Sequence, residues 1–289
     1  MKNILIVTDF SNAAQNAGRY GIELAKYFNA KVFLFNAFQV PIQVPESYLF
    51  YSVENTGEIT MELLKKEAEM INPGNLVAME ICGAEGTAAN AIISEATNRE
   101  ADMIICGMKS SVKTLRRIFG STITTLASKS DIPLIVVPEN SIFVIPKNIA
   151  LANDMDQETA NITFNMLKEL GEKFISKLSV VWVVDDGVDG EKEMRYRPKT
   201  FINEFKDLDP VLEYPSGSNI TKTIEGFIKE HEIDLLAIIP HKHDLLERFM
   251  TESITKNMIF HTEIPLLVLP QKKNAEMKNQ SSRITEAQD

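Results

Sequence analysis

Two glycines in one short stretch of the chain have the spacing of a phosphate-binding loop. Gly107 follows an apolar run that ends at Cys106, a basic segment comes next, and Gly120-Ser121-Thr122 opens a helical pattern. A strand that ends in glycine, then a loop and a helix N-terminus, offers main-chain N–H groups and positive charge to an anion. The stretch predicts nucleotide binding, although turn glycines and a solvated basic helix face produce the same pattern.

The charge distribution favours the anion-binding interpretation. The chain has 40 Asp+Glu and 30 Lys+Arg, giving a net charge of −10. Residues 103–130 nevertheless contain no acid, and their basic residues are Lys109, Lys113, Arg116, Arg117 and Lys129. An anion is therefore attracted to this segment of an otherwise acidic protein. Because nucleic acids need a broad basic face, we expect no nucleic-acid partner.

Composition indicates a globular protein with two domains. The chain has 289 residues, of which 44% are hydrophobic and 24% are charged, whereas single domains cluster near roughly 100–150 residues. No apolar run reaches the ~18 residues of a membrane span, and the start does not resemble a signal peptide, so we expect a cytoplasmic protein without membrane contact. Cys82 and Cys106 each end an apolar run and are predicted to be buried thiols rather than a disulfide or metal pair.

The two halves of the chain are weakly repeated. Residues 100–105 match 232–237, and residues 132–138 match 264–270, both at an offset of 132. Residues 3–9 match 148–154 at an offset of 145, so the first half has the longer middle. We expect domains at residues 1–140 and 141–270, followed by a disordered polar tail at 271–289.

Short apolar runs alternate with helical stripes in both halves. The predicted strands are residues 4–7, 31–37, 76–82, 103–106, 134–137, 149–152, 178–184, 211–214, 235–239 and 266–269. Such alternation predicts an α/β fold with two tandem doubly wound parallel sheets, each of five strands in the order 3-2-1-4-5. Strands one and four are neighbours in this order, so Asp9 would face Gly107 at the switch point where such sheets bind ligands. An Asp after a strand is also a common cap for the next helix.

The combination of Val7-Thr-Asp9-Phe-Ser11, the Gly107 to Gly120-Ser121 loop and the closing Ile132-Pro-Leu-Ile-Val-Val-Pro138 resembles the universal stress protein family of the UspA type, in its tandem form. The ATP-binding branch of that family carries Gly-x2-Gly-x9-Gly-Ser/Thr. One position departs from this pattern, because the second glycine is Ser110 here. Serine lacks the conformational freedom of glycine but could donate a hydroxyl hydrogen bond.

The resemblance implies ATP as the ligand, with or without Mg²⁺, in the first domain. It implies that Thr8 and Asp9 lie against adenine and ribose and that Ala37 borders the base. The phosphate loop and the helix start that follows it would be formed by Gly107, Met108, Lys109, Ser110, Gly120, Ser121 and Thr122.

The second half has lost this motif. At the offset of 132, Gly107 corresponds to Ile239, Ser110 to Lys242 and Gly120 to Glu252. A carboxylate at a helix N-terminus neutralises the helix dipole and repels phosphate. We therefore expect the second domain not to bind ATP, although Asp154 corresponds to Asp9.

Other residues give weaker chemical signals. His241 and His243 could chelate a metal, but exposed loop histidines are the more common explanation, and we expect no metal site. Trp182 ends an apolar run and is predicted to be a core or interface residue. No nucleophile and base can be paired, and no Gly-Lys-Ser/Thr loop is present, so we expect at most slow ATP hydrolysis.

Three functions follow from these observations. The first is a nucleotide-responsive stress or regulatory module with an unidentified protein partner. The second is an adenylate-forming or pyrophosphatase-like enzyme, which the absence of a Ser-Gly-Gly-type loop after the first strand disfavours. The third is a nucleotide-free scaffold or a binder of another small molecule. Because family members dimerise through the closing strand, we expect residues 134–137 and 266–269 to pair the halves as an intramolecular pseudo-dimer, with or without further homodimerisation.

Overall fold

A computed structural model gives the fold over residues 1–39, 56–109, 120–152, 164–189, 203–240 and 263–270. The strands are β1 (Asn3–Val7), β2 (Lys31–Phe38), β3 (Met79–Glu85), β4 (Met103–Met108), β5 (Leu134–Pro138), β6 (Asn148–Ala152), β7 (Lys177–Val181), β8 (Val211–Glu213), β9 (Leu235–Ile238) and β10 (Leu266–Val268). The helices are α1 (Asn12–Phe28), α2 (Thr56–Ile71), α3 (Ala88–Asn98), α4 (Gly120–Lys129), α5 (Asn165–Phe174), α8 (Ile220–Glu230) and the 3₁₀ helix η3 (Lys206–Leu208).

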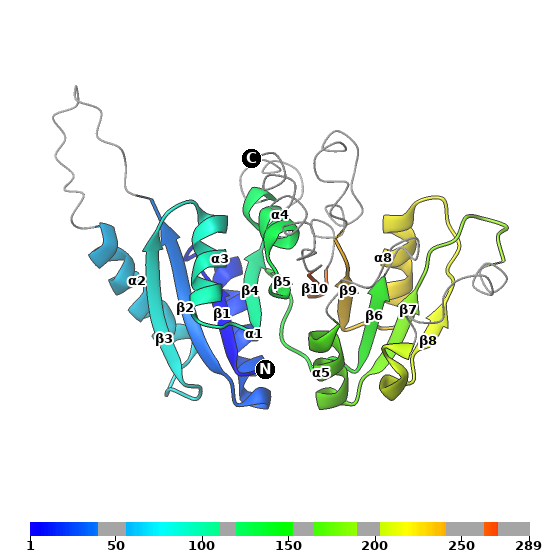
Figure 1. Ribbon diagram of the computed structural model, residues 1–289, viewed down its shortest axis with the longest axis horizontal. Helices are drawn as coiled ribbons and strands as arrows, with labels where there is room; N and C mark the ends of the chain where they lie inside the picture. The colour runs from blue at the N-terminus through cyan, green and yellow to red at the C-terminus, as the bar shows by residue number, and fades with distance from the viewer. Residues whose placement is uncertain (40–55, 110–119, 153–163, 190–202, 241–262, 271–289) are drawn as a thin grey trace, which may run out of the picture.

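The ten strands within these described ranges form one sheet in the order β3-β2-β1-β4-β5-β10-β9-β6-β7-β8 (Figure 1). Each half has the predicted order 3-2-1-4-5, and its strands are parallel. The halves join where β10 runs antiparallel to β5, with Leu267 opposite Ile135. The predicted pairing of the two closing strands within one chain is therefore confirmed. It protects two apolar strands that would otherwise be exposed sheet edges.

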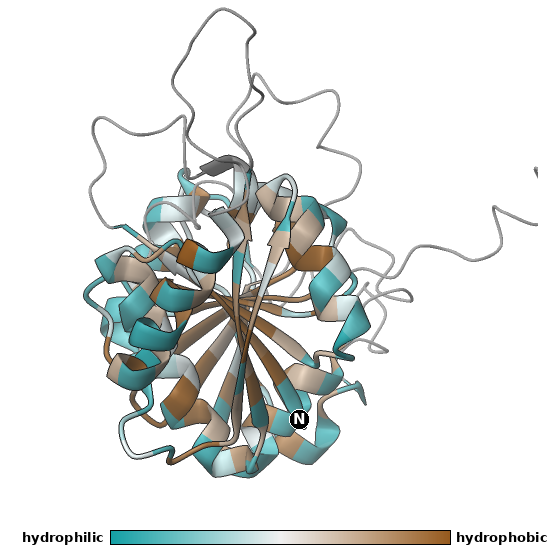
Figure 2. Cartoon of the chain, turned by 90° about the vertical axis from the view of Figure 1, so that its left-hand side faces the viewer, coloured by the Kyte–Doolittle hydropathy of each residue, from teal (hydrophilic) through white to brown (hydrophobic). Residues whose placement is uncertain are grey.

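Helices cover both faces of the sheet and create two core layers. One layer contains buried residues of α1, α2 and α5, and the other contains buried residues of α3, α4 and α8. Figure 2 shows the apolar strands fanned between helices whose outer surfaces are hydrophilic. Burial on both faces explains why the strands lack polar alternation in the sequence.

The internal repeat extends to individual hydrogen bonds. The carboxylate Oδ2 of Asp102 accepts from the main-chain N–H groups of Lys2 and Asn3, before and at the start of β1. Asp234 makes the same two bonds with Lys147 and Asn148 at the start of β6. The same turn geometry recurs as well, since Glu100 has φ 49° and Glu232 has φ 48°. Both halves therefore join the fourth strand to the first by the same carboxylate hydrogen bonds and the same turn.

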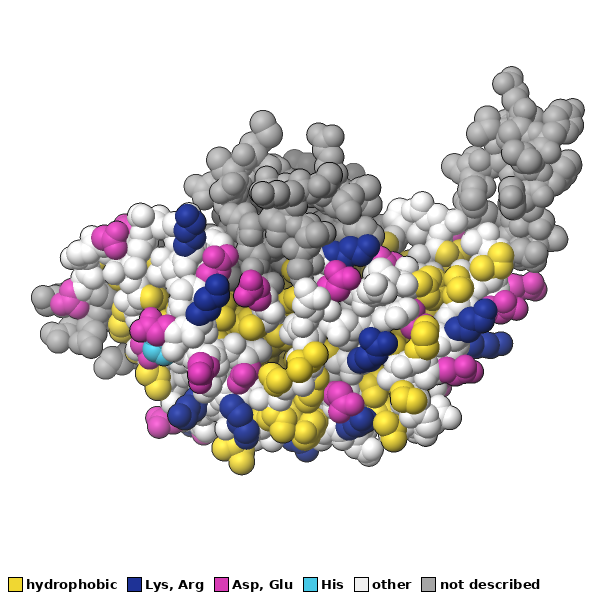
Figure 3. Space-filling model, turned by 180° about the vertical axis from the view of Figure 1, so that it is seen from behind, with side chains coloured by type: hydrophobic (Ala, Val, Ile, Leu, Met, Phe, Trp, Pro, Cys, Tyr) yellow, Lys and Arg dark blue, Asp and Glu magenta, His cyan; other side chains and the backbone are white. Residues whose placement is uncertain are grey.

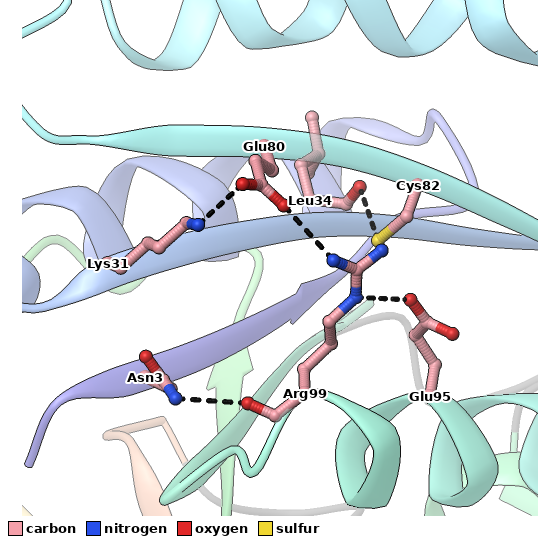
Figure 4. Close-up of polar contacts among 7 residues, drawn as sticks. All are labelled: Asn3, Lys31, Leu34, Glu80, Cys82, Glu95 and Arg99. Atoms are coloured by element: carbon pink, nitrogen blue, oxygen red, sulfur yellow. Dashed lines mark hydrogen bonds and ion pairs between the residues drawn. The ribbon is translucent and has the colours of Figure 1, made fainter.

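A polar cluster lies at the amino-terminal ends of the first strands (Figure 4). Arg99 donates to Glu95 at 2.8 Å and to Glu80 at 3.0 Å, and Lys31 also pairs with Glu80. The Arg99 guanidinium lies 5.0 Å from the centre of the Phe33 ring. These contacts stabilise the end of the sheet opposite to the ligand edge predicted from the sequence.

Aromatic side chains join the two halves beneath the sheet junction. Phe143, in the segment between β5 and β6, makes an edge-on contact with Tyr20 of α1 at 5.1 Å between ring centres. Tyr27 of α1 contacts Phe174 of α5 at 5.2 Å. Burial first, and the carboxylate of Asp234 second, raise the pKa of the Tyr20 hydroxyl. The halves are thus held by side-chain packing in addition to the β5–β10 pair.

Several predicted boundaries differ from the structure. β3 begins at Met79 rather than at residue 76, and Leu76 is 61% exposed. The reason is that Asn72 bonds both the N–H and the carbonyl of Val77, which holds this segment as a turn. β7 ends at Val181, and Val184 forms only an isolated bridge with Ser216. The tail predicted at residues 271–289 lies outside the described residues.

The surface charges, the helices and the two cysteines are those of a globular protein. On the face shown in Figure 3, the described basic and acidic side chains are interspersed, so the basic ones form no continuous stripe there. Within the described ranges, no helix is both long and apolar enough to cross a membrane. Cys82 and Cys106 are buried, free thiols, as the sequence predicts.

Candidate functional site

The carboxyl ends of β2, β1 and β4 meet at one edge of the sheet. Val7, the last residue of β1, lies opposite Phe35 of β2 and opposite Cys106 of β4. Asp9 therefore lies two residues after Val7, and Gly107 lies one residue after Cys106, the partner of Val7 in the sheet. Burial is the main cause that raises the pKa of the Cys106 thiol to about 12, and the charge of Asp9 raises it further. The register thus brings two of the predicted residues to one switch point.

Asp9 takes part in the start of α1. Its Oδ1 accepts from the N–H of Ser11 at 3.0 Å, which forms an Asx turn. Ser11 is the N-cap of α1, and its hydroxyl accepts from the N–H of Ala14 at 3.3 Å. Asp9 itself is exposed, so its carboxylate is accessible from the carboxyl edge of the sheet.

Thr8 is buried and has its polar groups engaged by the protein. Its N–H donates to the carbonyl of Phe35 at 2.9 Å, and its own carbonyl accepts from the side-chain amide of Asn36 at 2.8 Å. Its hydroxyl donates to Glu67 at 2.7 Å and accepts from the N–H of Phe10 at 2.8 Å. With only 2% of its surface exposed, Thr8 shapes the loop that carries Asp9.

Ala37 lies next to the last residue of β2. It pairs with Ala84 of β3 and is only half-buried. It packs against the core layer of α3 and α4. Its small side chain lies near the carboxyl end of β2.

Gly107 lies directly against the first turn of α1. A Cβ atom built on this glycine would stand 2.2 Å from the carbonyl oxygen of Ala13 and 2.7 Å from the nitrogen of Ala14. Real Cβ contacts are not this short, so no side chain fits without a backbone shift. The glycine therefore allows α1 to begin beside the end of β4.

Met108 and Lys109 have different surroundings. Met108 is 5% exposed and belongs to the core layer of α3 and α4. Its carbonyl accepts from the N–H of Glu139 at 2.8 Å. Lys109 is exposed at the end of the described segment. The predicted loop residue Ser110 lies outside the described residues, with the rest of residues 110–119.

Helix α4 begins at Gly120, where the sequence predicts a helical pattern to open. Gly120, Ser121 and Thr122 form its first turn, which contains no acid, and Lys129 lies in its last turn. No carboxylate within that turn neutralises the positive end of the helix dipole. The first turn of α4 therefore keeps its capacity to attract an anion.

Two polar residues near the site were missed from sequence. Asn36 interrupts an apolar strand, and its side chain supports the carbonyl of Thr8. Glu67 occupies the buried stripe of α2 with Thr60, Leu64 and Ile71. The sequence did offer one signal, because an acid within the apolar stripe of a helix is unusual: acids are rarely fully buried.

The environment of Glu67 favours its neutral form. Burial is the largest cause that raises the pKa of its carboxyl, and the Asp9 charge raises it further. The hydrogen bond from Thr8 and the charge of Arg19 act in the opposite direction. The net effect is a raised pKa.

The corresponding edge of the second half differs at the glycine. Ala152 of β6 lies opposite Ile238 of β9, as Val7 lies opposite Cys106. Ile239 therefore stands where Gly107 stands in the first half, and it is 5% exposed. A branched side chain excludes the close helix approach seen at Gly107. Asp154, Lys242 and Glu252 lie outside the described residues.

The other candidate residues do not assemble a site in the described part of the chain. There, no group of three His, Cys, Asp or Glu side chains is arranged to hold a metal ion. His231 is exposed and stacks on Phe227 at 4.0 Å between ring centres. His241, His243 and His261 lie outside the described residues. Trp182 directly follows β7 and is half-buried, and its main-chain N–H donates to the carbonyl of Glu213.

Comparisons with known proteins agree with this architecture. A universal stress protein of Methanocaldococcus jannaschii is 27% identical over 143 residues, which are 47% of this chain and 81% of that protein. A universal stress protein of Archaeoglobus fulgidus is similar in structure, with a TM-score of 0.69 at 14% identity, over 92% of this chain and 97% of that one. A putative universal stress protein of Pseudomonas aeruginosa gives a TM-score of 0.55 at 11% identity and covers 92% of both chains.

The structural matches extend over both halves and show the tandem fold. Residues 1–138, the first half of the chain, fit the profile of the Universal stress protein family. The first half of this chain is therefore similar in sequence to the universal stress protein family, and the whole chain shares the tandem fold of the solved structures.

Proposed function

We propose that this chain binds one ATP molecule, at the carboxyl edge of its first half, and acts as a nucleotide-responsive regulatory module. The observation that supports this most is the register that sets Val7 opposite Cys106. It puts the loop of Asp9 beside the start of the Gly107 segment, at the point where strand order reverses.

The residues of this edge fit the parts of a nucleotide. Asp9 is exposed and its carboxylate can accept hydrogen bonds from ribose hydroxyls. Ala37 provides a small apolar surface for a base. The phosphates belong with Gly107, Lys109, Ser110 and the first turn of α4, which has no acid. Residues 103–130, with five basic and no acidic residues, supply the matching positive charge.

The side chains of Thr8 and Met108 would not contact the nucleotide directly. The Thr8 hydroxyl is used by Glu67 and Phe10, and the Met108 side chain lies in the core. Both residues would act through the backbone they hold in place. Universal stress proteins have been solved with cAMP and with AMP bound. For this chain, the proposal of an adenine nucleotide rests on its own residues at the carboxyl edge of the first half.

The second half would not bind ATP. Ile239, a branched and buried residue, stands at the position of Gly107, and Glu252 replaces Gly120 in sequence. One nucleotide per chain is therefore expected. Mg²⁺ would accompany the phosphates without a dedicated protein cage, and turnover would be slow because no Gly-Lys-Ser/Thr loop is present.

Mass spectrometry of small molecules released from purified, unsupplemented protein tests this proposal. Adenine nucleotide in near-equal amount to the chain supports it. Another small molecule, or empty protein that also fails to bind added ATP, contradicts it and favours a scaffold or a different ligand. A variant with Asp9→Ala and Gly120→Glu should release no nucleotide.

A further inference from the structure

Glu67 is a buried acid whose carboxyl is only half satisfied. The residue is 1% exposed, within the core-facing stripe of α2. Its Oε1 accepts from Thr8, whereas its buried Oε2 has no hydrogen-bond partner in the described part of the chain. An apolar side chain would fill this position at lower cost, since a buried unpaired polar atom destabilises the fold. Its presence therefore calls for a reason other than stability.

Glu67 is connected to the ligand edge through one side chain. The hydroxyl of Thr8 has a single proton, which it donates to Glu67, so its lone pairs are free to accept from the N–H of Phe10. Phe10 has φ 63°, in the left-handed region that bulky residues avoid. The Thr8 hydroxyl thus holds a strained turn, and Asp9 is the residue within that turn.

Charge at this point also matters for an anionic ligand. The charge of Asp9 already acts on Glu67, and the charge of Arg19 of α1 acts on it in the opposite direction. A second carboxylate charge would repel phosphate. Burial, the largest cause, raises the pKa of Glu67 and so favours the neutral form, which supports the loop without that repulsion.

We propose that Glu67 is a positioning residue for nucleotide binding: from within α2 it fixes the hydroxyl of Thr8 and thereby the turn that presents Asp9. This inference rests on the proposed function, because it assigns the ligand contact to Asp9. Glu67 itself touches no ligand.

Three single variants of the full chain separate positioning from a merely structural role. Glu67→Met removes the acceptor for Thr8 and keeps the apolar volume. Glu67→Gln keeps a carbonyl acceptor and carries no charge at any pH. Glu69→Met, at an exposed position of the same helix, is the matched control. ATP affinity, thermal midpoint and amide hydrogen exchange of nucleotide-free protein are measured for each.

Glu67→Met is expected to weaken ATP binding roughly tenfold, the factor that corresponds to one lost hydrogen bond. It should speed exchange at the Phe10 amide while its thermal midpoint stays near that of the wild type. Glu67→Gln should restore both affinity and protection. As the pH rises, the ratio of wild-type to Glu67→Gln Kd should increase, because only the wild-type side chain gains charge.

The inference is overturned if Glu67→Met binds ATP like the wild type, or if its affinity and thermal midpoint fall together and Glu67→Gln does not restore them. Failure of the wild-type chain itself to bind ATP would instead overturn the proposed function. The two failures are distinguishable because the wild type and Glu69→Met are measured in the same series.

Discussion

Gly107 and Ala13 are in backbone contact: a Cβ atom on Gly107 would lie 2.2 Å from the carbonyl oxygen of Ala13. This contact joins the end of β4 to the first turn of α1, the two elements that flank the proposed nucleotide. Close packing, rather than a positive φ angle, therefore explains why glycine is required at this position. Sequence suggested a loop glycine, whereas the structure adds that the strand end and the helix start share one space.

Gly107→Ala is expected to destabilise the chain, because the added methyl group meets backbone atoms that cannot rotate away. Overpacking of this kind costs about 1–3 kcal/mol. Gly226→Ala is the matched control, since its Cβ would meet nothing within 4 Å and it lies inside α8. That substitution should stabilise the helix by about 0.5–1 kcal/mol. Urea unfolding of both variants checks the comparison, and equal effects would refute the contact as the cause.

Phe143→Ala should weaken the packing between the halves. The ring is half-buried and contacts Tyr20 and Tyr27 at 5.1 and 5.8 Å between ring centres. Loss of a partly buried aromatic ring of this kind costs on the order of 2 kcal/mol, below the range for a fully buried one. Ile142→Ala removes a neighbouring side chain that is 73% exposed and should leave stability unchanged. A thermal midpoint that falls equally in both variants would exclude the aromatic contact as an anchor.

The two cysteines should be unreactive in the native chain at pH 8. Burial is the largest cause that raises the pKa of Cys82 and of Cys106 to about 12, so both thiols stay neutral and shielded. Iodoacetamide labelling followed by mass spectrometry should give no adduct in buffer and two adducts in denaturant. Rapid labelling of either cysteine in buffer would contradict its placement in the core.

The same raised pKa values predict how stability changes at alkaline pH. Below the ordinary thiol value of 9.0 both states keep their protons, so the contribution of the thiols is fully present. Above it the unfolded chain releases protons that the folded chain retains, so stability falls by up to about 1.4 kcal/mol per pH unit for each thiol. Cys106→Ala should show a shallower fall over the same pH range.

The architecture was accessible from sequence because it depends on local patterns. Apolar runs at residues 4–7 and 103–106 identified two strands, and the repeat of residues 132–138 at 264–270 indicated that β5 and β10 are equivalent. Their pairing was expected from the family resemblance. Boundaries were less accessible at Leu76, because a side-chain contact from Asn72 decides that turn.

The support of the site could not be predicted in the same way. Glu67 meets Thr8 across 59 residues, and Asn36 meets it across 28. No spacing rule links such positions, since their contact depends on how α2 and β2 pack around β1. The contact of Gly107 with Ala13 is of the same kind. Sequence therefore identified the residues at the edge of the sheet, and the structure identified what holds them there.

The most direct test is a calorimetric titration of the full chain with ATP, compared with a variant carrying both Asp9→Ala and Gly120→Glu. We predict one ATP per chain for the wild type and none for the variant, because the second half has Ile239 where the first has Gly107. Two ATP molecules per chain, undiminished binding by the variant, or no binding by the wild type would contradict a single nucleotide site in the first half.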